Sequence, residues 1–483
     1  MKPTVLCVNP YIHDFTAFDL WMKPLGLYWI AAFLEEAGYD VQFLDCVDRC
    51  NPIWLKAQGL TKPKGKKNGC GPIGSTVIEK PEIYACIPRH YRRFGIPVNL
   101  LDEILDNMPK PQAIVVTSMM TYWYRGVVET IQILRRHFPG VPIALGGVYA
   151  TLCTEHAKKV CGADIVLPGL SEMKLLQWVG NITGHNGNFP DNGILAPEDL
   201  PMPAHHFLFP NSNAVIATSL GCPLHCTYCA SRILQPKYRQ RPISKVIDEI
   251  NYLVHKKRIH NIAFYDDALL INAENHLVPL LETLKERSWS VHFHASNGLH
   301  ASLITPKIAR LFLEAKVDTL RFSYERTPVF NPGSSYSSED PVLKQGLSYI
   351  YEAIKETGYK IQPEVYVKVF LPNQTLEEIV DGLVYVHEQG GYIKLADYSP
   401  VPGTHDFEKI MGKFGIDPTE PLYQNKTTLP HFMGISEEEI VQPIKMLMNA
   451  LNSALEHGVN LFNKHSVVQR AFLQSISRLE LPK

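Results

Sequence analysis

Three closely spaced cysteines are the residues of this chain best suited to chemistry. Cys222, Cys226 and Cys229 form a C-x3-C-x2-C run directly after the apolar stretch 214–219. At this spacing a strand does not turn all three thiols to one side, whereas a loop can bring them together. Thiolates are the usual ligands of iron–sulfur clusters. Three ligands, where a closed metal site has four, predict one open coordination position.

A partial barrel is predicted around this loop. Strands are expected near 214–219, 261–265, 290–295, 318–323, 365–370 and 393–396, with helices between them. Six strand–helix units are fewer than the eight of a closed barrel. Ser244 is expected to cap the first helix, whereas Thr375 with Glu378 and Ser436 with Glu439 are expected to form capping boxes on later helices.

The regions on either side have their own patterns. Residues 1–183 alternate short apolar strands, at 4–9, 41–45, 113–117, 142–145 and 165–167, with helical segments, and carry an insertion at 51–98. Such alternation indicates an α/β domain with a doubly wound parallel sheet, whose ligands bind beyond the carboxyl ends of the strands. Residues 184–210 are predicted to be a linker, 211–410 the barrel, and 411–483 a small helical domain.

Composition limits the partners. The 483 residues are 45% hydrophobic and 20% charged, which suits two or three globular domains. The net charge of −1 gives no electrostatic reason to expect nucleic acid as a partner, and no apolar run is long enough for a membrane span. The N-terminus lacks a secretory signal pattern, so a cytoplasmic protein is expected. No cysteine follows Cys229, which excludes a second cysteine-ligated cluster in the C-terminal half.

The cysteine loop, in this strand context, resembles that of the radical S-adenosylmethionine (SAM) superfamily. The cysteine spacing, the aromatic Tyr228 before the last cysteine and the preceding strand all match. The resemblance implies that Cys222, Cys226 and Cys229 hold three irons of a [4Fe–4S] cluster and that SAM binds the fourth. One electron from the cluster then splits SAM and yields a 5′-deoxyadenosyl radical. A zinc knuckle or a chance cluster of thiols is the alternative.

Polar residues at later strand ends match positions where this family contacts SAM. By the resemblance, Asp266 and Asp267 meet the SAM amine, and Asn297 bonds its ribose or carboxylate. Ser323 and Glu325 end the fourth strand, where the family has a polar contact to SAM, with Glu325 suited to the ribose hydroxyls. The alternative for the aspartates is an N-cap of the helix expected over 272–287.

A doubly wound domain ahead of such a barrel resembles the cobalamin-dependent radical SAM enzymes. This resemblance implies a cobalamin site made of Asn9, Ser118, Met119, Tyr122, Gly146, Gly147, Val148, Tyr149 and Thr151. The glycine pair would admit a bulky ligand close to the backbone, while Ser118 and Thr151 could bond the nucleotide tail. An ordinary tight turn, or core and rim positions for Met119 and Tyr122, are the alternatives.

One departure concerns the lower axial ligand of cobalamin. The D-x-H-x-x-G motif, which supplies a histidine ligand in some cobalamin proteins, is absent from this chain. His13 stands near the corresponding place after the first strand. A surface histidine is the alternative to a ligand there.

The resemblance implies a methyltransferase that adds a methyl group to an unactivated carbon by way of a 5′-deoxyadenosyl radical and methylcobalamin. A rearrangement or cyclisation with the same cofactors, without methyl transfer, is an alternative reaction. A redox sensor that uses only the iron–sulfur loop is an alternative of another class. An electron donor such as flavodoxin or ferredoxin is expected, and the substrate stays open between a peptide, a lipid and a small metabolite.

Overall fold

The computed structural model describes residues 2–185, 195–324, 340–371 and 374–458. The chain divides into two compact units. The first consists of Met1–Ile216, Ala230–Ile262 and Asp417–Gln424, and the second of Ala217–Cys229, Ala263–Ile416 and Asn425–Lys483. The cysteine loop therefore belongs to the second unit, although the chain on both sides of it belongs to the first.

The first unit is built on a five-stranded sheet in the order β10-β9-β8-β1-β4, and all its strand pairs are parallel. Its strands are β1 (Thr4–Asn9), β4 (Asp40–Asp45), β8 (Ala113–Val116), β9 (Ile143–Leu145) and β10 (Ile165–Val166). The chain starts at the interior strand β1, adds β4 on one side of it, and then adds β8, β9 and β10 on the other side. The predicted doubly wound parallel sheet is therefore confirmed.

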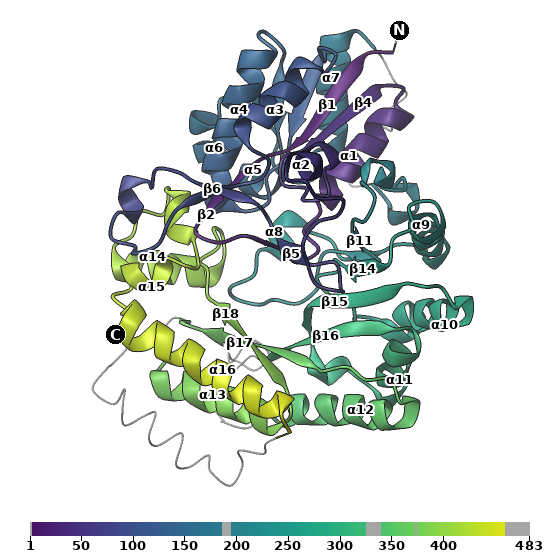
Figure 1. Ribbon diagram of the computed structural model, residues 1–483, viewed down its shortest axis with the longest axis vertical. Helices are drawn as coiled ribbons and strands as arrows, with labels where there is room; N and C mark the ends of the chain where they lie inside the picture. The colour runs from purple at the N-terminus through teal and green to yellow at the C-terminus, as the bar shows by residue number, and fades with distance from the viewer. Residues whose placement is uncertain (1, 186–194, 325–339, 372–373, 459–483) are drawn as a thin grey trace. The chain divides into compact units, whose positions relative to one another are not determined.

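Helices cover both faces of this sheet, as Figure 1 shows. α1 and α7 pack against each other on one face, and α3 and α4 pack against each other on the opposite face. This follows from right-handed crossovers, which place helices on opposite faces when the chain winds in opposite directions. The helices are α1 (Leu25–Glu36), α3 (Val98–Asp106), α4 (Tyr124–His137), α5 (Gly147–Leu152), α6 (Thr154–Val160) and α7 (Glu172–Thr183).

The insertion at 51–98 forms small elements of its own. It contains α2 (Pro52–Ala57), β5 (Gly71–Pro72), β6 (Ser75–Val77) and β7 (Arg92–Phe94). β7 pairs antiparallel with β6 and with β2 (Ile12–Asp14), and β5 pairs with β3 (Phe18–Asp19). The arginine-rich stretch 87–93 therefore ends in a strand of this antiparallel sheet.

A second sheet has six strands in the order β11-β14-β15-β16-β17-β18. Its strands are β11 (Ala214–Ile216), β14 (Asn261–Phe264), β15 (His292–Leu299), β16 (Val317–Tyr324), β17 (Glu364–Val369) and β18 (Tyr392–Asp397). β15 to β18 run parallel. Six strands in sequence order confirm the predicted count. β11 and the start of β14 are grouped with the first unit.

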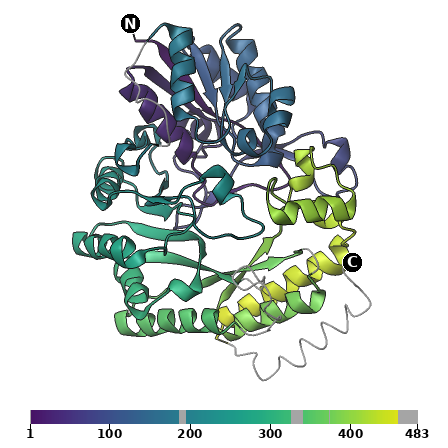
Figure 2. The ribbon, with the colours of Figure 1, turned by 180° about the vertical axis from the view of Figure 1, so that it is seen from behind.

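Helices of the second unit line one face of β15–β18, visible from both sides in Figures 1 and 2. They are α10 (Leu277–Arg287), α11 (Pro306–Glu314), α12 (Pro341–Thr357), α13 (Leu376–Glu388) and α16 (Gln442–Glu456). The second unit also contains α14 (His405–Phe414) and α15 (Leu429–Phe432). A π-helical turn at Glu437–Val441 precedes α16, and α8 (Ser231–Leu234) and α9 (Ile243–His255) belong to the first unit. None of the helices in the described ranges is long and apolar enough to cross a membrane.

The helix starts show which capping signals act. Thr375 and Glu378 form the predicted reciprocal box at α13. Ser436 accepts a bond from the Glu439 backbone N–H, as expected, but the turn that it opens is π-helical. The expected cap at Ser244 is wrong, because α9 begins at Ile243, after Pro242, with no side-chain cap. The alternative aspartate cap over 272–287 is also wrong, since α10 begins at Leu277 after His276.

Candidate functional site

The three cysteines lie on an irregular loop between the short strand β12 (Ser219–Leu220) and α8. Gly221 opens it with φ of +78°, a conformation that glycine adopts without strain. The Cys229 backbone N–H donates to the Cys226 carbonyl at 3.2 Å, which turns the chain between these two residues. All three are reduced thiols; Cys222 and Cys226 are half-buried and Cys229 is exposed. The donor set and its exposure suit an iron–sulfur cluster at the surface of the second unit.

The surroundings of Cys222 disfavour the ionised form of its thiol. Burial raises the pKa of the Cys222 thiol, and the nearby Asp267 and Cys229 raise it further, against a backbone bond from Leu224. A thiol in such surroundings becomes a thiolate when a metal cation binds it. In the described part of the chain, no three His, Cys, Asp or Glu side chains are placed to hold a single metal ion. A [4Fe–4S] cluster places a different requirement on its ligands, because each cysteine binds a different iron.

Asp266 is buried in the second unit, and its carboxylate is hydrogen-bonded to two residues of that unit. Its carboxylate accepts bonds from the Thr218 N–H and hydroxyl, at 3.0 and 2.7 Å, and from the Ser219 N–H and hydroxyl, both at 2.6 Å. The residue is 2% exposed, and burial raises its pKa against those hydrogen bonds. Asp266 therefore anchors the two residues that lead into the cysteine loop.

The other SAM candidates are more open. Asp267 is exposed, and it is the acidic residue whose charge reaches Cys222. Asn297 is exposed and uses its amide N–H to bond the Asp266 carbonyl at 3.0 Å. Ser323 is half-buried at the end of β16. Glu325 lies outside the described residues. Asp267, Asn297 and Ser323 thus lie at the ends of successive strands of the second sheet.

The absence of a side chain at Gly298 leaves room for Ser323 at the neighbouring strand end. A Cβ at Gly298 would meet the Ser323 Oγ at 2.0 Å, so the Ser323 hydroxyl occupies the volume that any larger residue would need. Gly298 follows Asn297 directly, and it lets these two polar side chains stay at adjacent strand ends.

Four of the cobalamin candidates are interior residues of the first unit. Asn9, Ser118, Tyr122 and Tyr149 are each at most 4% exposed. The Ser118 hydroxyl donates to the Gly146 carbonyl at 2.7 Å and accepts the Tyr149 N–H at 3.1 Å. Asn9 donates to Asp45 at 2.8 Å. These buried side chains support the strand ends from the interior of the first unit.

The other five candidates present backbone and small side chains at the same strand ends. Gly147 is exposed, and Met119, Gly146, Val148 and Thr151 are half-buried. Gly147 has φ of +88°, and a Cβ there would come within 2.4 Å of the Ser118 carbonyl oxygen. The Val148 N–H donates to that same oxygen at 2.7 Å. At Gly146 and Gly147 no side chain stands between the backbone and a ligand, which suits close contact with a broad planar ligand.

His13 is not the surface histidine that was the alternative to a ligand. It is 6% exposed, and its Nε2 lies 2.6 Å from Glu129 Oε2. Arg93 donates to the other oxygen of Glu129 at 2.7 Å. The His13 Nδ1 is buried and makes no hydrogen bond within the described part of the chain. The carboxylate of Glu129 thus orients His13 through one ring nitrogen.

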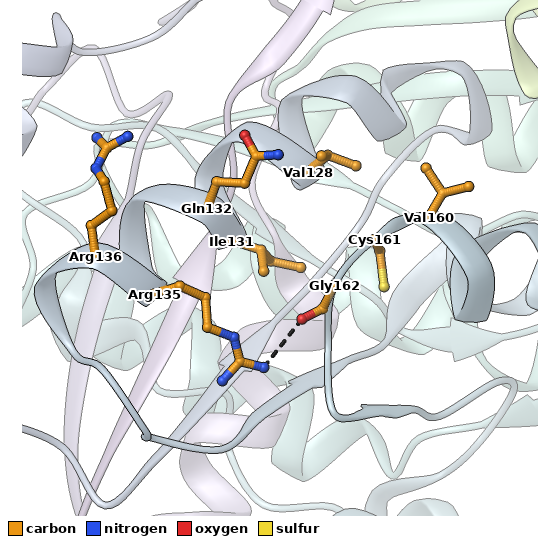
Figure 3. Close-up of a pocket in the computed structure, with 8 residues that line it drawn as sticks. All are labelled: Val128, Ile131, Gln132, Arg135, Arg136, Val160, Cys161 and Gly162. Carbon is orange, nitrogen blue, oxygen red and sulfur yellow. Dashed lines mark hydrogen bonds between the residues drawn. The ribbon is translucent and has the colours of Figure 1, made fainter.

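A cavity of about 450 Å³ lies elsewhere in the first unit, between α4 and α6 (Figure 3). It is lined by Val128, Ile131, Gln132, Arg135, Arg136, Val160, Cys161 and Gly162. Arg135 donates to the Gly162 carbonyl at 3.1 Å and pairs with Asp164 at 2.6 Å. None of the candidate site residues lines this cavity, which lies on the helical layer and not at the strand ends.

Three residues at the cysteine loop were missed by the sequence reasoning. They are Thr227, Asp406 of α14, which contacts Thr227, and Lys368 of β17, which contacts Tyr228. A signal for Lys368 was present, because it occupies the face of the strand opposite the buried valines at 367 and 369. No sequence signal linked Asp406 to a loop 179 residues earlier.

Comparison with known proteins finds a family match for part of the chain and two similar methyltransferases. The Radical SAM superfamily matches residues 216–394. An uncharacterized methyltransferase of Pyrococcus horikoshii is 22% identical over 302 residues, which are 55% of this chain and 62% of that protein, so the chain matches less than two thirds of that relative. The cytidylyl-2-hydroxyethylphosphonate methyltransferase of Streptomyces wedmorensis is 21% identical over 487 residues, covering 87% of this chain and 84% of that protein.

Solved structures of TsrM, a radical SAM methyltransferase from Kitasatospora setae, share the fold. The structure with cobalamin and a [4Fe–4S] cluster superposes with a TM-score of 0.60 at 14% identity, over 88% of this chain and 82% of TsrM. The structure with tryptophan substrate and the SAM analogue aza-SAM gives 0.58 at 15% identity, over 86% and 77%. Residues 216–394 of this chain therefore match the Radical SAM superfamily, and the chain shares the fold of TsrM over most of its length.

Proposed function

We propose that this chain is a cobalamin-dependent radical SAM methyltransferase that methylates an unactivated carbon. The observation that carries the proposal is the three-cysteine loop at the start of a radical SAM domain, in a chain that also contains a doubly wound sheet. Both curated relatives are methyltransferases by name, and TsrM binds cobalamin and a [4Fe–4S] cluster.

The residues of the second unit have distinct roles at the cluster. Cys222, Cys226 and Cys229 would ligate three irons, and Asp267 would meet the amine of SAM. Asn297 and Ser323, with Glu325 from the sequence alone, would bond its ribose or carboxylate. Asp266 would hold the loop in place through Thr218 and Ser219. When bound, the cluster supplies the electron that cleaves SAM, and cobalamin carries the methyl group.

The first unit, within residues 1–183, would hold cobalamin at the carboxyl ends of its strands. The backbone of Gly146 and of the exposed Gly147, together with Met119, Val148 and Thr151, would contact the ligand. Asn9, Ser118, Tyr122 and Tyr149 would support these residues from the interior. We also propose a cytoplasmic enzyme that receives its electrons from flavodoxin or ferredoxin, because SAM cleavage needs a one-electron donor of low potential.

The test is a product analysis on the anaerobically reconstituted full chain. The protein is loaded with iron, sulfide and hydroxocobalamin, reduced, and incubated with SAM that carries a labelled methyl group. Candidate substrates include cytidylyl-2-hydroxyethylphosphonate and tryptophan, the compounds named for two of its relatives. We expect 5′-deoxyadenosine and S-adenosylhomocysteine as products, with label in the substrate that is accepted.

Two controls make the result decisive. Cys226→Ala should lose the cluster and all SAM cleavage, whereas Cys86→Ala, which removes an exposed cysteine outside the loop, should keep both. Deoxyadenosine formed without any S-adenosylhomocysteine would reject methyl transfer. SAM cleavage that persists in Cys226→Ala would reject the cluster assignment.

A further inference from the structure

Thr227, between the second and third cysteines, is fixed by the start of α14. Its hydroxyl donates to Asp406 Oδ2 at 2.9 Å, and the Asp406 backbone N–H donates to the Thr227 carbonyl at 3.2 Å. Asp406 is 9% exposed, and Thr404 caps the helix that carries it. One residue of the helix therefore bonds both the side chain and the backbone of one residue of the loop.

Tyr228, the next residue, is contacted from β17. The ammonium of Lys368 lies 2.9 Å from the centroid of the Tyr228 ring, in a cation–π contact. Val367 and Val369 are buried on the opposite face of the strand, so the alternation of β17 directs Lys368 toward the loop. Both residues between Cys226 and Cys229 are thus held by elements that lie far away in sequence.

The two contacts bring opposite charges to adjacent residues of the cysteine loop. A carboxylate contacts the residue after Cys226, and an ammonium contacts the residue before Cys229. The reduction potential of an iron–sulfur cluster depends on nearby charge and on hydrogen bonding. A negative charge disfavours the reduced cluster, which has gained an electron, whereas a positive charge favours it.

We propose that Asp406 and Lys368 are positioning residues for the cluster. They hold the Cys226–Cys229 turn in its ligating conformation, and they set the reduction potential of the cluster in opposite directions. Asp406 lowers the potential and Lys368 raises it. The proposal rests on the cluster of the proposed function and adds residues outside its ligand set.

The test is a potentiometric titration of the reconstituted full-length protein, followed by EPR of the reduced cluster. Asp406→Asn keeps an oxygen that accepts from Thr227 and removes the charge, so the potential should rise. Lys368→Met removes the positive charge with similar chain length, so the potential should fall. The matched controls are Glu408→Gln, exposed on the same helix, and Lys355→Met, exposed on α12, and neither should move the potential.

Iron content tests the positioning role separately. Thr227→Val removes the hydroxyl but keeps both charges, and it should lower the iron bound per chain, whereas Thr227→Ser should restore it. Potentials of Asp406→Asn and Lys368→Met that shift in the same direction, or stay at the wild-type value, would overturn the proposal, as would full iron content in Thr227→Val. If the wild type binds no cluster, the proposed function itself fails; a wild-type cluster with unmoved variants rejects only this inference.

Discussion

At the scale of single residues, Gly147 shows how the strand ends of the first unit depend on the absence of a side chain. Its positive φ opposes any larger residue, and so does the Ser118 carbonyl oxygen, 2.4 Å from the place that a Cβ would take. Gly147→Ala should lower the free energy of unfolding by about 2 kcal/mol more than Gly140→Ala. Gly140 also has a positive φ, +76°, but nothing lies within 4 Å of its Cβ position.

Chemical denaturation of the two variants measures this difference. Equal losses would show that φ alone matters and that the close approach to Ser118 is relieved at no cost. Cobalamin binding, followed by its absorption spectrum, should weaken in Gly147→Ala and stay unchanged in Gly140→Ala, because only Gly147 lies at the proposed site.

A buried acid at the end of β4 gives the first unit a dependence on pH. Burial raises the pKa of Asp45 to about 7, and the nearby Asp48 adds to this rise against Lys23 and the bonds from Val47 and Asn9. Asp45 therefore binds its proton more tightly in the folded state than in the unfolded state. Its contribution to stability is present at low pH and is lost as pH rises from about 4 to about 7.

Asp45→Asn should remove this dependence, because an amide can still accept the bonds from Asn9 and Val47. The free energy of unfolding of the wild type minus that of the variant should fall across this pH range, by on the order of 3 kcal/mol. Asp40→Asn, exposed at the start of the same strand, is the matched control. A difference that stays constant from about pH 4 to about pH 7 would contradict the assignment.

At the scale of elements, α16 protects the edge of the second sheet. The Asn452 side chain accepts the Ile393 N–H at 2.8 Å and donates to the Ile393 carbonyl at 2.9 Å. Ile393 lies on β18, the last strand of the sheet, whose outer edge pairs with no further strand among the described residues. Asn452 is 4% exposed, so its bonds to this edge are shielded from solvent.

Asn452→Ala should lower the free energy of unfolding by about 2–3 kcal/mol, because it leaves two buried backbone groups without partners. Asn449→Ala, exposed one turn earlier on the same helix, should change it by less than about 0.5 kcal/mol. Urea denaturation compares the two variants. A loss of stability in Asn452→Ala as small as that in Asn449→Ala would mean that the backbone groups of Ile393 find other partners.

The elements themselves were largely predictable, since each prediction used local patterns. Buried parallel strands read as short apolar runs, and all eleven expected strands of the two large sheets are present. The capping box at Thr375 was equally local. What could not be predicted is which distant segment each element meets. The contacts of Asp406 with Thr227 and of Asn452 with Ile393 join residues that no spacing rule connects.

The same limit applies to the candidate site. The sequence identified the three cysteines, because their spacing is short-range and their chemistry is specific. It could not separate Asp266 from Asp267, which are neighbours in sequence but differ in exposure and in hydrogen bonding. Burial is a property of the folded chain, and it assigns one aspartate to the interior and the other to the surface.

At the scale of the whole molecule, a buried ion cluster connects distant segments of the first unit. His205, which precedes β11, bonds Glu249 of α9 at 2.8 Å, and Arg241 donates to the other oxygen of Glu249 at 2.7 Å. All three side chains are at most 1% exposed. Arg241 also lies over the Trp29 ring of α1 at 5.7 Å. These contacts join His205, Arg241 and α9 to α1, which agrees with the grouping of α9 in the first unit.

The cluster predicts that a substitution of Glu249 destabilises the first unit and leaves the second unit unchanged. Burial opposes ionisation, but the bonds and charges of His205 and Arg241 lower the pKa of Glu249 below its ordinary value. Glu249→Gln leaves Arg241 as a buried charge without its ionic partner, so the first unit should lose about 3–5 kcal/mol of stability. Hydrogen exchange should then become faster in α1 and α9 and stay unchanged in α12. Glu314→Gln, which breaks a surface pair with Lys285, should alter neither. Faster exchange in α12 to the same degree would show that the chain unfolds as one cooperative body, and that Glu249 stabilises all of it.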